Sequence, residues 1–453
     1  MTSLLAMLPQ FDPVLPNAAP IPVPALPADS PMAVRVMELL NSYAPVFLVG
    51  FLTTMLATPL VRIAAVHLEI IDKPDQQRKM HSYPIAYLGG MAVLLGVLAA
   101  LGCSYLLSDG IGGIYQRVPA AVIIGLLAIT FTGLADDAWG WDPRLKVAGQ
   151  LVAAAALAVQ DIGTRVAEGA LANTIGPSDA ILLQLGSVAI HNGDLYYWIG
   201  IALIAVFVLG GCNATNLIDG LDGLLSGTVG IMMVGFLAVS LMMATAMPGP
   251  DPLASLDGAR IALCLATLGA VLGFLPWNFN PAVIFLGDCG SLQLGYLCVV
   301  VILMFGEQGH THLVLAGLII FSLPIMDTAL AILRRRLAGV PFSTPDSNHI
   351  HHQFKRACGT VRKAVIALYG VVGVFTLLGV TIAGLRIYGL IRVQVIYIVA
   401  FVLFGWITVA AIKSARRQQW NMAAAKAADR GPAAVAPHGT AAEQPGKPVR
   451  SAH

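Results

Sequence analysis

The chain has 453 residues, of which 57% are hydrophobic and only 11% are charged, and its mean hydropathy is +0.79. Soluble globular domains carry about 25% charged residues, so this composition excludes an ordinary soluble protein and predicts an integral membrane protein. The net charge of +2 gives no sign of a nucleic-acid partner, and none is expected. The six scattered cysteines lack metal-binding spacing and are expected to be small buried residues.

The two ends of the chain differ in composition from its middle. Residues 1–43 are rich in proline and alanine, and residues 414–453 combine alanine, glycine, proline and charge. Such segments bury too little apolar surface to fold, so both are expected to be disordered. Residues 44–413 are then the integral membrane domain.

Eleven apolar segments in this domain have the length, or nearly the length, of about 20 residues that a membrane-spanning helix needs. They are 44–66, 87–108, 118–135, 145–160, 196–212, 224–248, 260–277, 291–306, 312–333, 364–385 and 391–413. The fourth is short, and the ninth contains Pro324 and Asp327, so we expect a break there. The expected fold class is an all-α polytopic membrane protein with about eleven transmembrane helices. The loop 161–195 has room for a short hairpin or a surface helix.

Lysine and arginine residues indicate the orientation. If each segment crosses once, 20 of the 26 lysines and arginines fall on one side and 6 on the other. The positive-inside rule makes the richer side cytoplasmic. The N-terminus is then outside, the C-terminus is cytoplasmic, and the acidic clusters described next all lie in cytoplasmic loops, where they are expected to form one active site.

The first cluster is Asp136-Asp137, at the end of a segment expected to be helical. Adjacent carboxylates repel each other, and they meet the negative end of the helix dipole. We therefore expect a metal ion, a basic neighbour or a catalytic proton transfer to offset the pair, with Lys146 and Gln150 as plausible neighbours. An ordinary polar loop is the alternative.

The second cluster, in residues 213–224, contains Asn216, Asp219 and Asp222 with two glycines. Side-chain oxygens suit Mg²⁺ or Mn²⁺, and glycines allow a ligand to approach closely. Simple turn chemistry is the alternative.

The third cluster, Gly287-Asp288-Cys289-Gly290-Ser291, opens an apolar segment. Free N–H groups at a helix N-terminus bind phosphate, whereas Asp288 would reach a phosphate only through a bridging cation. The pattern predicts a metal-nucleotide or metal-pyrophosphate site, with a simple aspartate N-cap as the alternative.

The fourth cluster follows the ninth segment and consists of Arg334, Arg335, Arg336, Asp346, His349, His351 and His352. The arginines fit the positive-inside signal. His349 and His352 would share one helix face. Zinc is disfavoured because no cysteine or Glu-x-x-His accompanies the histidines, so they are interpreted as donors to a diphosphate.

The last string contains Asp72, Pro74, Arg78, Lys79 and His81, and precedes Gly89-Gly90. Cations beside a membrane attract lipid headgroups in general. The functional interpretation is a grip on an anionic lipid headgroup.

These five strings, in this order, resemble those of the polyprenyl-phosphate N-acetylhexosamine-1-phosphate transferases over about residues 44–365. The resemblance implies transfer of an N-acetylhexosamine 1-phosphate from a UDP-sugar to a polyprenyl phosphate, with release of UMP and with Mg²⁺ or Mn²⁺ as cofactor. His349-Ile350-His351-His352 is similar to the N-acetylglucosamine branch, whose members initiate cell-surface glycans. The branch that uses the muramoyl-pentapeptide nucleotide usually shows three consecutive histidines.

The resemblance also implies a task for each matching residue. The catalytic group is Asp136, Asp137 and Asp219, and the metal-binding group is Asn216 and Asp288. The nucleotide-binding group is Asp222, Asn278, Phe285 and Gly287, with Phe285 as a stacking surface. The diphosphate and sugar group is His349, His351, His352 and Arg335, and the lipid-phosphate group is Lys79 and His81.

Two departures from the family pattern stand out. Ala86-Tyr87-Leu88 precedes Gly89-Gly90, where many members have Pro-Arg, and Ser347 stands where a basic residue is common. The second position is associated with sugar recognition, so another UDP-N-acetylhexosamine and the muramoyl-pentapeptide nucleotide stay open as donors.

An ion-coupled transporter is the alternative from a different class, since such proteins also carry acids and histidines, although near the bilayer midplane. The expected partners are a UDP-sugar, a polyprenyl phosphate and the membrane, with a second copy of the chain as a further candidate. The expected location is the inner membrane of a bacterium, with the active site in the cytoplasm.

Overall fold

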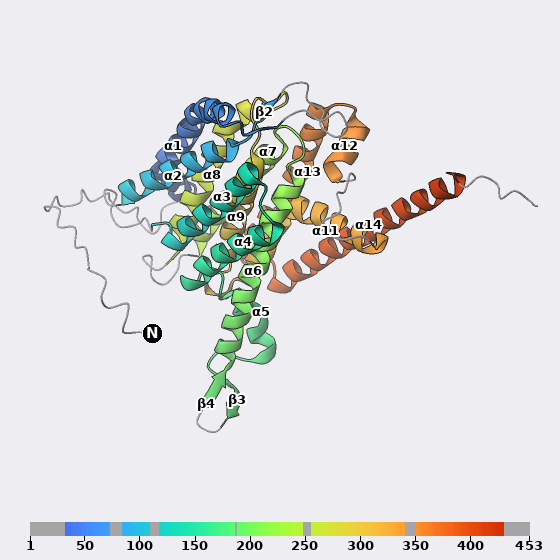
Figure 1. Ribbon diagram of the computed structural model, residues 1–453. Coiled ribbons are helices and arrows are strands. Elements are labelled where there is room, and N and C mark those ends of the chain that lie inside the picture. The colour runs from blue at the N-terminus through green and yellow to red at the C-terminus, as the bar shows by residue number, and fades with distance from the viewer. Residues whose placement is uncertain are drawn as a thin grey trace, which may run out of the picture.

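The computed structural model describes residues 32–72, 84–108, 117–185, 188–247, 255–339 and 349–429. Figure 1 shows a bundle of long helices, from one end of which a short helix and a hairpin project. The helices are α1 (Met32–His67), α2 (Gly89–Ser108), α3 (Ala120–Trp139), α4 (Pro143–Val159), α5 (Val166–Ile175), α6 (Asn192–Ile218), α7 (Leu224–Ala246), α8 (Asp257–Asn278), α9 (Gly287–Met304), η2 (Glu307–Gly309), α10 (Thr311–Ile320), α11 (Ser322–Ala338), α12 (Ile350–Cys358), α13 (Val361–Ile387) and α14 (Val393–Asp429).

Each of the eleven predicted segments coincides over most of its length with a helix or with the pair α10–α11, which confirms the all-α polytopic fold. Within the described ranges, nine helices are long and apolar enough to cross a membrane, and the bent pair α10–α11 brings the number to ten. The remaining predicted segment is α4, which has only 17 residues. The orientation of the bundle in the membrane stays a prediction.

The predicted break in the ninth segment is confirmed. Helices α10 and α11 meet at Phe321 and are bent by 77°. Pro324 explains the position of the bend, because its ring conflicts with the carbonyl group four residues earlier, that of Ile320, and it has no N–H to donate.

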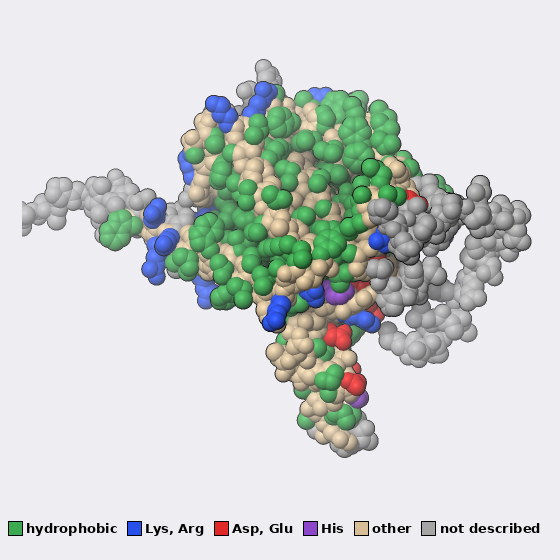
Figure 2. All heavy atoms as spheres, turned by 180° about the vertical axis from the view of Figure 1, so that it is seen from behind, with side chains coloured by type: hydrophobic (Ala, Val, Ile, Leu, Met, Phe, Trp, Pro, Cys, Tyr) green, Lys and Arg blue, Asp and Glu red, His purple; other side chains and the backbone are tan. Residues whose placement is uncertain are grey.

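Helices α8 and α9 form the centre of the bundle, with 89% and 94% of their spanning residues buried, against 17% for α14. Helices that are apolar on every side belong in such a core or in lipid. Figure 2 shows hydrophobic side chains covering the flank of the bundle, as a lipid-facing surface requires. The six cysteines are free. The predicted burial is confirmed for four of them, whereas Cys103 and Cys358 are only partly buried.

The predicted disorder was wrong next to the membrane domain. Helix α1 begins at Met32 rather than near residue 44, and α14 continues to Asp429 rather than ending near 413. Alanine, methionine, leucine, arginine and glutamine are good helix formers. A membrane helix supplies the nucleus, so these neighbouring residues extend it at little cost.

Two small sheets lie at opposite ends of the bundle in Figure 1. Strands β1 (Ile71–Asp72) and β2 (Ile85–Ala86) pair near the start of α2, and Ala86 also bridges to Ile284. Strands β3 (Ile181–Leu185) and β4 (Val188–His191) form the hairpin that projects with α5. The loop 161–195 therefore holds both a helix and a hairpin.

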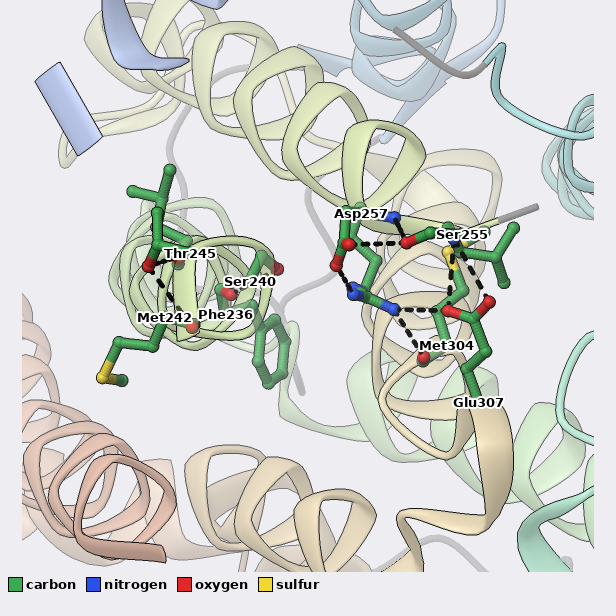
Figure 3. A network of polar contacts seen from close by, with 11 residues as sticks. Phe236, Ser240, Met242, Thr245, Ser255, Asp257, Met304 and Glu307 are labelled. Atoms are coloured by element: carbon green, nitrogen blue, oxygen red, sulfur yellow. Dashed lines mark hydrogen bonds and ion pairs between the residues drawn. The ribbon is translucent and has the colours of Figure 1, made fainter. Parts of the chain in front are cut away.

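At the hairpin end of the bundle, α8 begins and α9 ends around the buried Arg260. Its guanidinium donates to the Met304 carbonyl at 3.1 Å and to Glu307 Oε2 at 2.9 Å, and it also pairs with Asp257 (Figure 3). Glu307 in turn accepts from the backbone N–H of Leu256. The charged groups of this cluster therefore pair with each other and with backbone groups at the ends of α8 and α9.

Candidate active site

At the other end of α8 and α9, a cavity of about 670 Å³ opens where α6 and α8 end and α9 begins. Carboxylate, amide, aromatic and cationic side chains share its wall. The lining residues are Asp72, Ile85, Tyr87, Asn216, Asp219, Gly220, Leu221, Asp222, Asn278, Asn280, Pro281, Ala282, Phe285, Leu286, Gly287, Asp288, His352, Lys355 and Val361. Segments that are more than 200 residues apart in the sequence therefore converge, as the acidic clusters predicted.

Asp137 caps helix α9. Its Oδ1 accepts from the N–H of Asp288 at 2.8 Å and its Oδ2 from the N–H of Cys289 at 2.9 Å. The positive end of the α9 dipole offsets this carboxylate. The phosphate site predicted at this helix N-terminus is therefore already occupied by a side chain. Gly287 has φ +71° and its Cα faces Asp137, where a Cβ would lie 2.5 Å from Oδ2, so this glycine makes the capping possible.

Lys146 joins two of the acidic clusters. Its Nζ lies 2.6 Å from Asp136 Oδ2 and 2.5 Å from Asp288 Oδ2. The short turn between α3 and α4 brings it there: α3 stops at Gly140 with φ +62°, and Asp142 then caps the first turn of α4. Lys146 is the predicted basic neighbour of the aspartate pair, whereas Gln150 bonds to Asn213 instead.

The two predicted metal ligands are in direct contact. The Asn216 amide donates to Asp288 Oδ1 at 2.8 Å and to Ser291 Oγ at 2.9 Å. Asp219 follows α6 and lines the same cavity. Although its side chain keeps contact with the cavity, burial raises the pKa of Asp219 to about 8, and the charges of Asp288, Asp137 and Asp222 add to the shift. Within the described ranges, no three His, Cys, Asp or Glu side chains form a ready metal site.

Asp222 and Asn278 hold the loop that closes one side of the cavity. Asp222 Oδ2 accepts from the Asn280 amide at 2.8 Å and from the N–H of Ala282 at 3.1 Å. Asn278 is buried, and its amide accepts from Ser226 Oγ at 2.8 Å and donates to the Ile284 carbonyl at 3.1 Å. Asp222 and Asn278, two of the four predicted nucleotide-binding residues, line the cavity, and the hydrogen bonds of Asn278 also hold its wall in place.

Phe285 stands in the cavity wall beside Tyr87. The two ring centroids are 5.9 Å apart and the planes meet at 60°, an edge-to-face contact. Tyr87 was not among the predicted site residues. The signal that could have revealed it is its position in the string before Gly89-Gly90, where the sequence departs from the family pattern.

The three histidines lie together but in different surroundings. His349 Nδ1 is 2.9 Å from Asp327 Oδ2, and Asp327 Oδ1 accepts from the N–H of Ile350, so this acid of α11 caps α12. His351 is buried, stacks on His349 and packs against Gly220, and burial lowers its pKa to about 3. Only His352 of the three lines the cavity. Lys355, one turn further along α12, also lines it and was missed.

Within the described residues, several predicted site residues do not line the cavity, namely Asp136, Asp137, His349, His351 and Arg335. Arg335 is half-buried near the end of α11 and is not a lining residue. Lys79 and His81, like Asp346, lie outside the described residues, so their predicted tasks stay predictions.

The site geometry coincides with a family match. The sequence model of glycosyl transferase family 4 matches residues 119–306, which contain Asp136, Asp137, Asn216, Asp219, Asp222, Asn278, Phe285, Gly287 and Asp288. The chain is also 32% identical over 349 residues to the decaprenyl-phosphate N-acetylglucosaminephosphotransferase of Mycobacterium leprae, covering 74% of this chain and 82% of that protein. The chain belongs to this glycosyl transferase family.

Other relatives of this family member carry similar names. It is 29% identical to the probable undecaprenyl-phosphate N-acetylglucosaminyl 1-phosphate transferase of Bacillus subtilis, over 76% of this chain and 85% of that protein. It is also 29% identical to the undecaprenyl-phosphate α-N-acetylglucosaminyl 1-phosphate transferase of Salmonella typhi, over 84% of this chain and 94% of that protein. Each match spans most of both chains, so the similarity extends beyond the cavity to the helix bundle.

Proposed function

We propose that this protein transfers N-acetylglucosamine 1-phosphate from UDP-N-acetylglucosamine to a polyprenyl phosphate, giving a polyprenyl-diphosphate sugar and UMP. The observation that carries the proposal is the meeting of four acids at the helix ends: Asp219 and Asp288 line one cavity, and Asp136 and Asp137 are joined to Asp288 through Lys146 and the start of α9. The names of the relatives support the acceptor and the sugar. Family membership favours this transferase over the ion-coupled transporter.

The acids of the cavity fit a hard divalent cation, for which we propose Mg²⁺ or Mn²⁺. Asp288, Asp219 and the carbonyl oxygen of Asn216 are oxygen donors, and Mg²⁺ is commonly held by one or two carboxylates together with substrate phosphates. A site with only two carboxylates and one amide oxygen from the protein is compatible with this mode of binding, in which the phosphates supply further ligands. When bound, the cation would neutralise charge on the diphosphate of the donor.

The residues of the chain divide the remaining work. Both oxygens of Asp137 accept backbone N–H groups, and Asp136 is held by Lys146 and by a side-chain hydrogen bond with Asp288. One carboxylate of this pair is the proposed acceptor for the proton of the lipid phosphate. The phosphate oxygen then attacks the sugar-bearing phosphorus in line, and UMP leaves with the electrons of the broken P–O bond. Phosphoryl transfer of this kind depends mainly on positioning and on charge.

We further propose that the cavity faces the cytoplasm, across the inner membrane of a bacterium, and that the product initiates a cell-surface glycan. The excess of lysine and arginine on this side supports the orientation. A cysteine introduced at Ser347 and one introduced at Gly389, tested with an impermeant thiol reagent in a cysteine-free background, would report opposite sides. Labelling of both from outside would contradict the orientation.

The reaction is tested with purified protein, polyprenyl phosphate, Mg²⁺ and a panel of donors: UDP-N-acetylglucosamine, UDP-N-acetylgalactosamine and the muramoyl-pentapeptide nucleotide. We expect UMP release that requires the lipid and is fastest with the first donor. Faster release from another donor would change the sugar, and no lipid-dependent UMP from any donor would refute the function.

A further inference from the structure

Tyr87 is held rigidly in the cavity wall by backbone hydrogen bonds on both sides. Its N–H donates to the Ile70 carbonyl at 3.1 Å. The backbone of its neighbours is bonded to Phe285. The Phe285 N–H donates to the Ala86 carbonyl at 2.9 Å, and the Phe285 carbonyl accepts from the N–H of Gly89 at 2.9 Å. These bonds fix the backbone at Tyr87 relative to Phe285, although the two residues are nearly 200 positions apart in the sequence.

The rings of Tyr87 and Phe285 form an aromatic corner of the cavity. Both side chains line it, and the edge of one ring meets the face of the other. Aromatic faces are the usual contact surface for a planar base. The corner thus places the nucleoside of a bound nucleotide next to Tyr87.

The hydroxyl group of Tyr87 is a donor without a protein acceptor among the residues that the structure describes. Burial raises the pKa of Tyr87 to about 12, and the charges of Asp137, Asp219 and Asp288 add to this. The phenol therefore keeps its proton across the physiological range. It also lies close enough to the acids for their charges to act on it, which is the side of the cavity where phosphates must be held.

The three amide side chains in the cavity wall each donate to the protein. The Asn216 amide donates to Asp288 and Ser291. The Asn278 amide donates to the Ile284 carbonyl, and the Asn280 amide donates to Asp222. A phosphate that enters this acidic cavity needs donors that can turn towards it, and Tyr87 offers one.

We propose that the Tyr87 hydroxyl donates a hydrogen bond to a phosphate oxygen of the uridine nucleotide whose base packs on the Tyr87–Phe285 corner. The inference rests on the proposed function and identifies a substrate contact within the same site. A phosphate of the polyprenyl lipid has the same chemistry, but the contact between Tyr87 and Phe285 favours the nucleotide.

The kinetic test is Tyr87→Phe, which keeps the ring and removes only the hydroxyl. A hydrogen bond to a charged group is worth enough to raise the KM for UDP-N-acetylglucosamine about tenfold, with kcat and the KM for polyprenyl phosphate unchanged. Tyr388→Phe is the matched control, because Tyr388 is exposed at the far end of α13. A nucleotide KM equal to that of the wild type, or an effect confined to the lipid KM, would overturn the proposal.

A binding measurement separates this contact from a structural effect of the ring. Calorimetry of the purified proteins should show that Tyr87→Phe lowers the affinity for UMP about tenfold and leaves the affinity for uridine unchanged. Equal losses for both ligands would contradict a phosphate contact. Failure of the proposed function would look different, since the wild type itself would then release no UMP from any UDP-sugar.

Discussion

The two polar clusters of the bundle lie at opposite ends of the same two helices, α8 and α9, and they use their charges differently. Around Arg260, one buried cation pairs with Asp257 and Glu307 and with a backbone carbonyl. Beside the cavity, Lys146 is shared between Asp136 and Asp288, while Asp219 in the cavity wall has its pKa raised by the charges of Asp288, Asp137 and Asp222. Figure 3 shows Asp257, Met304 and Glu307 of the first cluster around one guanidinium group.

The charges around Arg260 stabilise the fold, whereas the acids at the cavity are available to bind a ligand. Buried ion pairs with satisfied hydrogen bonds hold helix ends in place. Carboxylates crowded together without enough cations are unfavourable unless something else binds them. The comparison therefore predicts that removing a cavity acid costs activity, whereas removing Arg260 costs stability.

The largest expected effect is on activity, in Asp288→Asn. This change removes the charge that faces Lys146 and the proposed cation, so kcat should fall about a thousandfold, which corresponds to roughly 4 kcal/mol. UMP release by purified protein measures it. The thermal unfolding midpoint should stay within a few degrees of the wild type. A variant with wild-type kcat would show that Asp288 has no part in the reaction.

The next effect is on stability, in Arg260→Met. Removing one partner of a buried ion cluster costs about 3–5 kcal/mol, because Asp257 and Glu307 lose their counter-charge. Thermal unfolding in detergent measures this loss. The exposed Arg392→Met is the matched control and should change stability by no more than about 0.5 kcal/mol.

The kcat of folded Arg260→Met protein should equal that of the wild type, because Arg260 lies about 27 Å along α8 from the cavity residue Asn278. If Arg260→Met kept the stability of the wild type and lost activity, Arg260 would serve the reaction and not the fold, which would contradict the account.

A smaller effect is expected at the floor of the cavity, in Gly220→Ala. A Cβ on Gly220 would lie 2.2 Å from His351 Nε2, so the His351 ring or helix α12 must shift, and a shift of α12 moves His352 and Lys355. Displacements of about 1 Å in an active site can cost about a hundredfold in rate, and we expect a loss in kcat/KM of about ten- to a hundredfold. Gly370→Ala, which meets open space in α13, is the control and should keep full activity.

The sequence predicted those parts of the fold that depend on one segment at a time. Apolar length gave the helices, and Pro324 gave the bend, because both properties belong to the segment itself. The acids were predicted to converge because the alternation of spans placed them on one side. Lys146 was found because it lies in the first turn of the helix that follows the aspartate pair after a short connection.

Contacts between distant segments could not be predicted in this way. The capping of α9 by Asp137 joins residues about 150 positions apart, and the capping of α12 by Asp327 depends on the bend in α10–α11. Hydrophobic patterning says which residues face lipid or water, but not which helix ends meet. For the same reason Tyr87 and Lys355 were missed: only the packed structure brings them to the cavity.

The central claim, that the cavity acids are held against their own repulsion for a ligand, is tested most directly by the pH dependence of stability in Asp219→Asn. Folding raises the pKa of Asp219 to about 8, from about 3.9 in the unfolded chain. Between these values the folded state keeps a proton that the unfolded state has lost, so this residue makes the wild type less stable as pH rises, by up to about 1.4 kcal/mol per pH unit.

Thermal unfolding of wild type and Asp219→Asn, without divalent cations and from pH 5.5 to 8.5, measures the difference. We predict that the variant gains stability over the wild type as the pH rises and is the more stable protein at pH 8. A variant that is less stable than the wild type at pH 8, as Arg260→Met should be, would show that Asp219 serves the fold and would contradict the account.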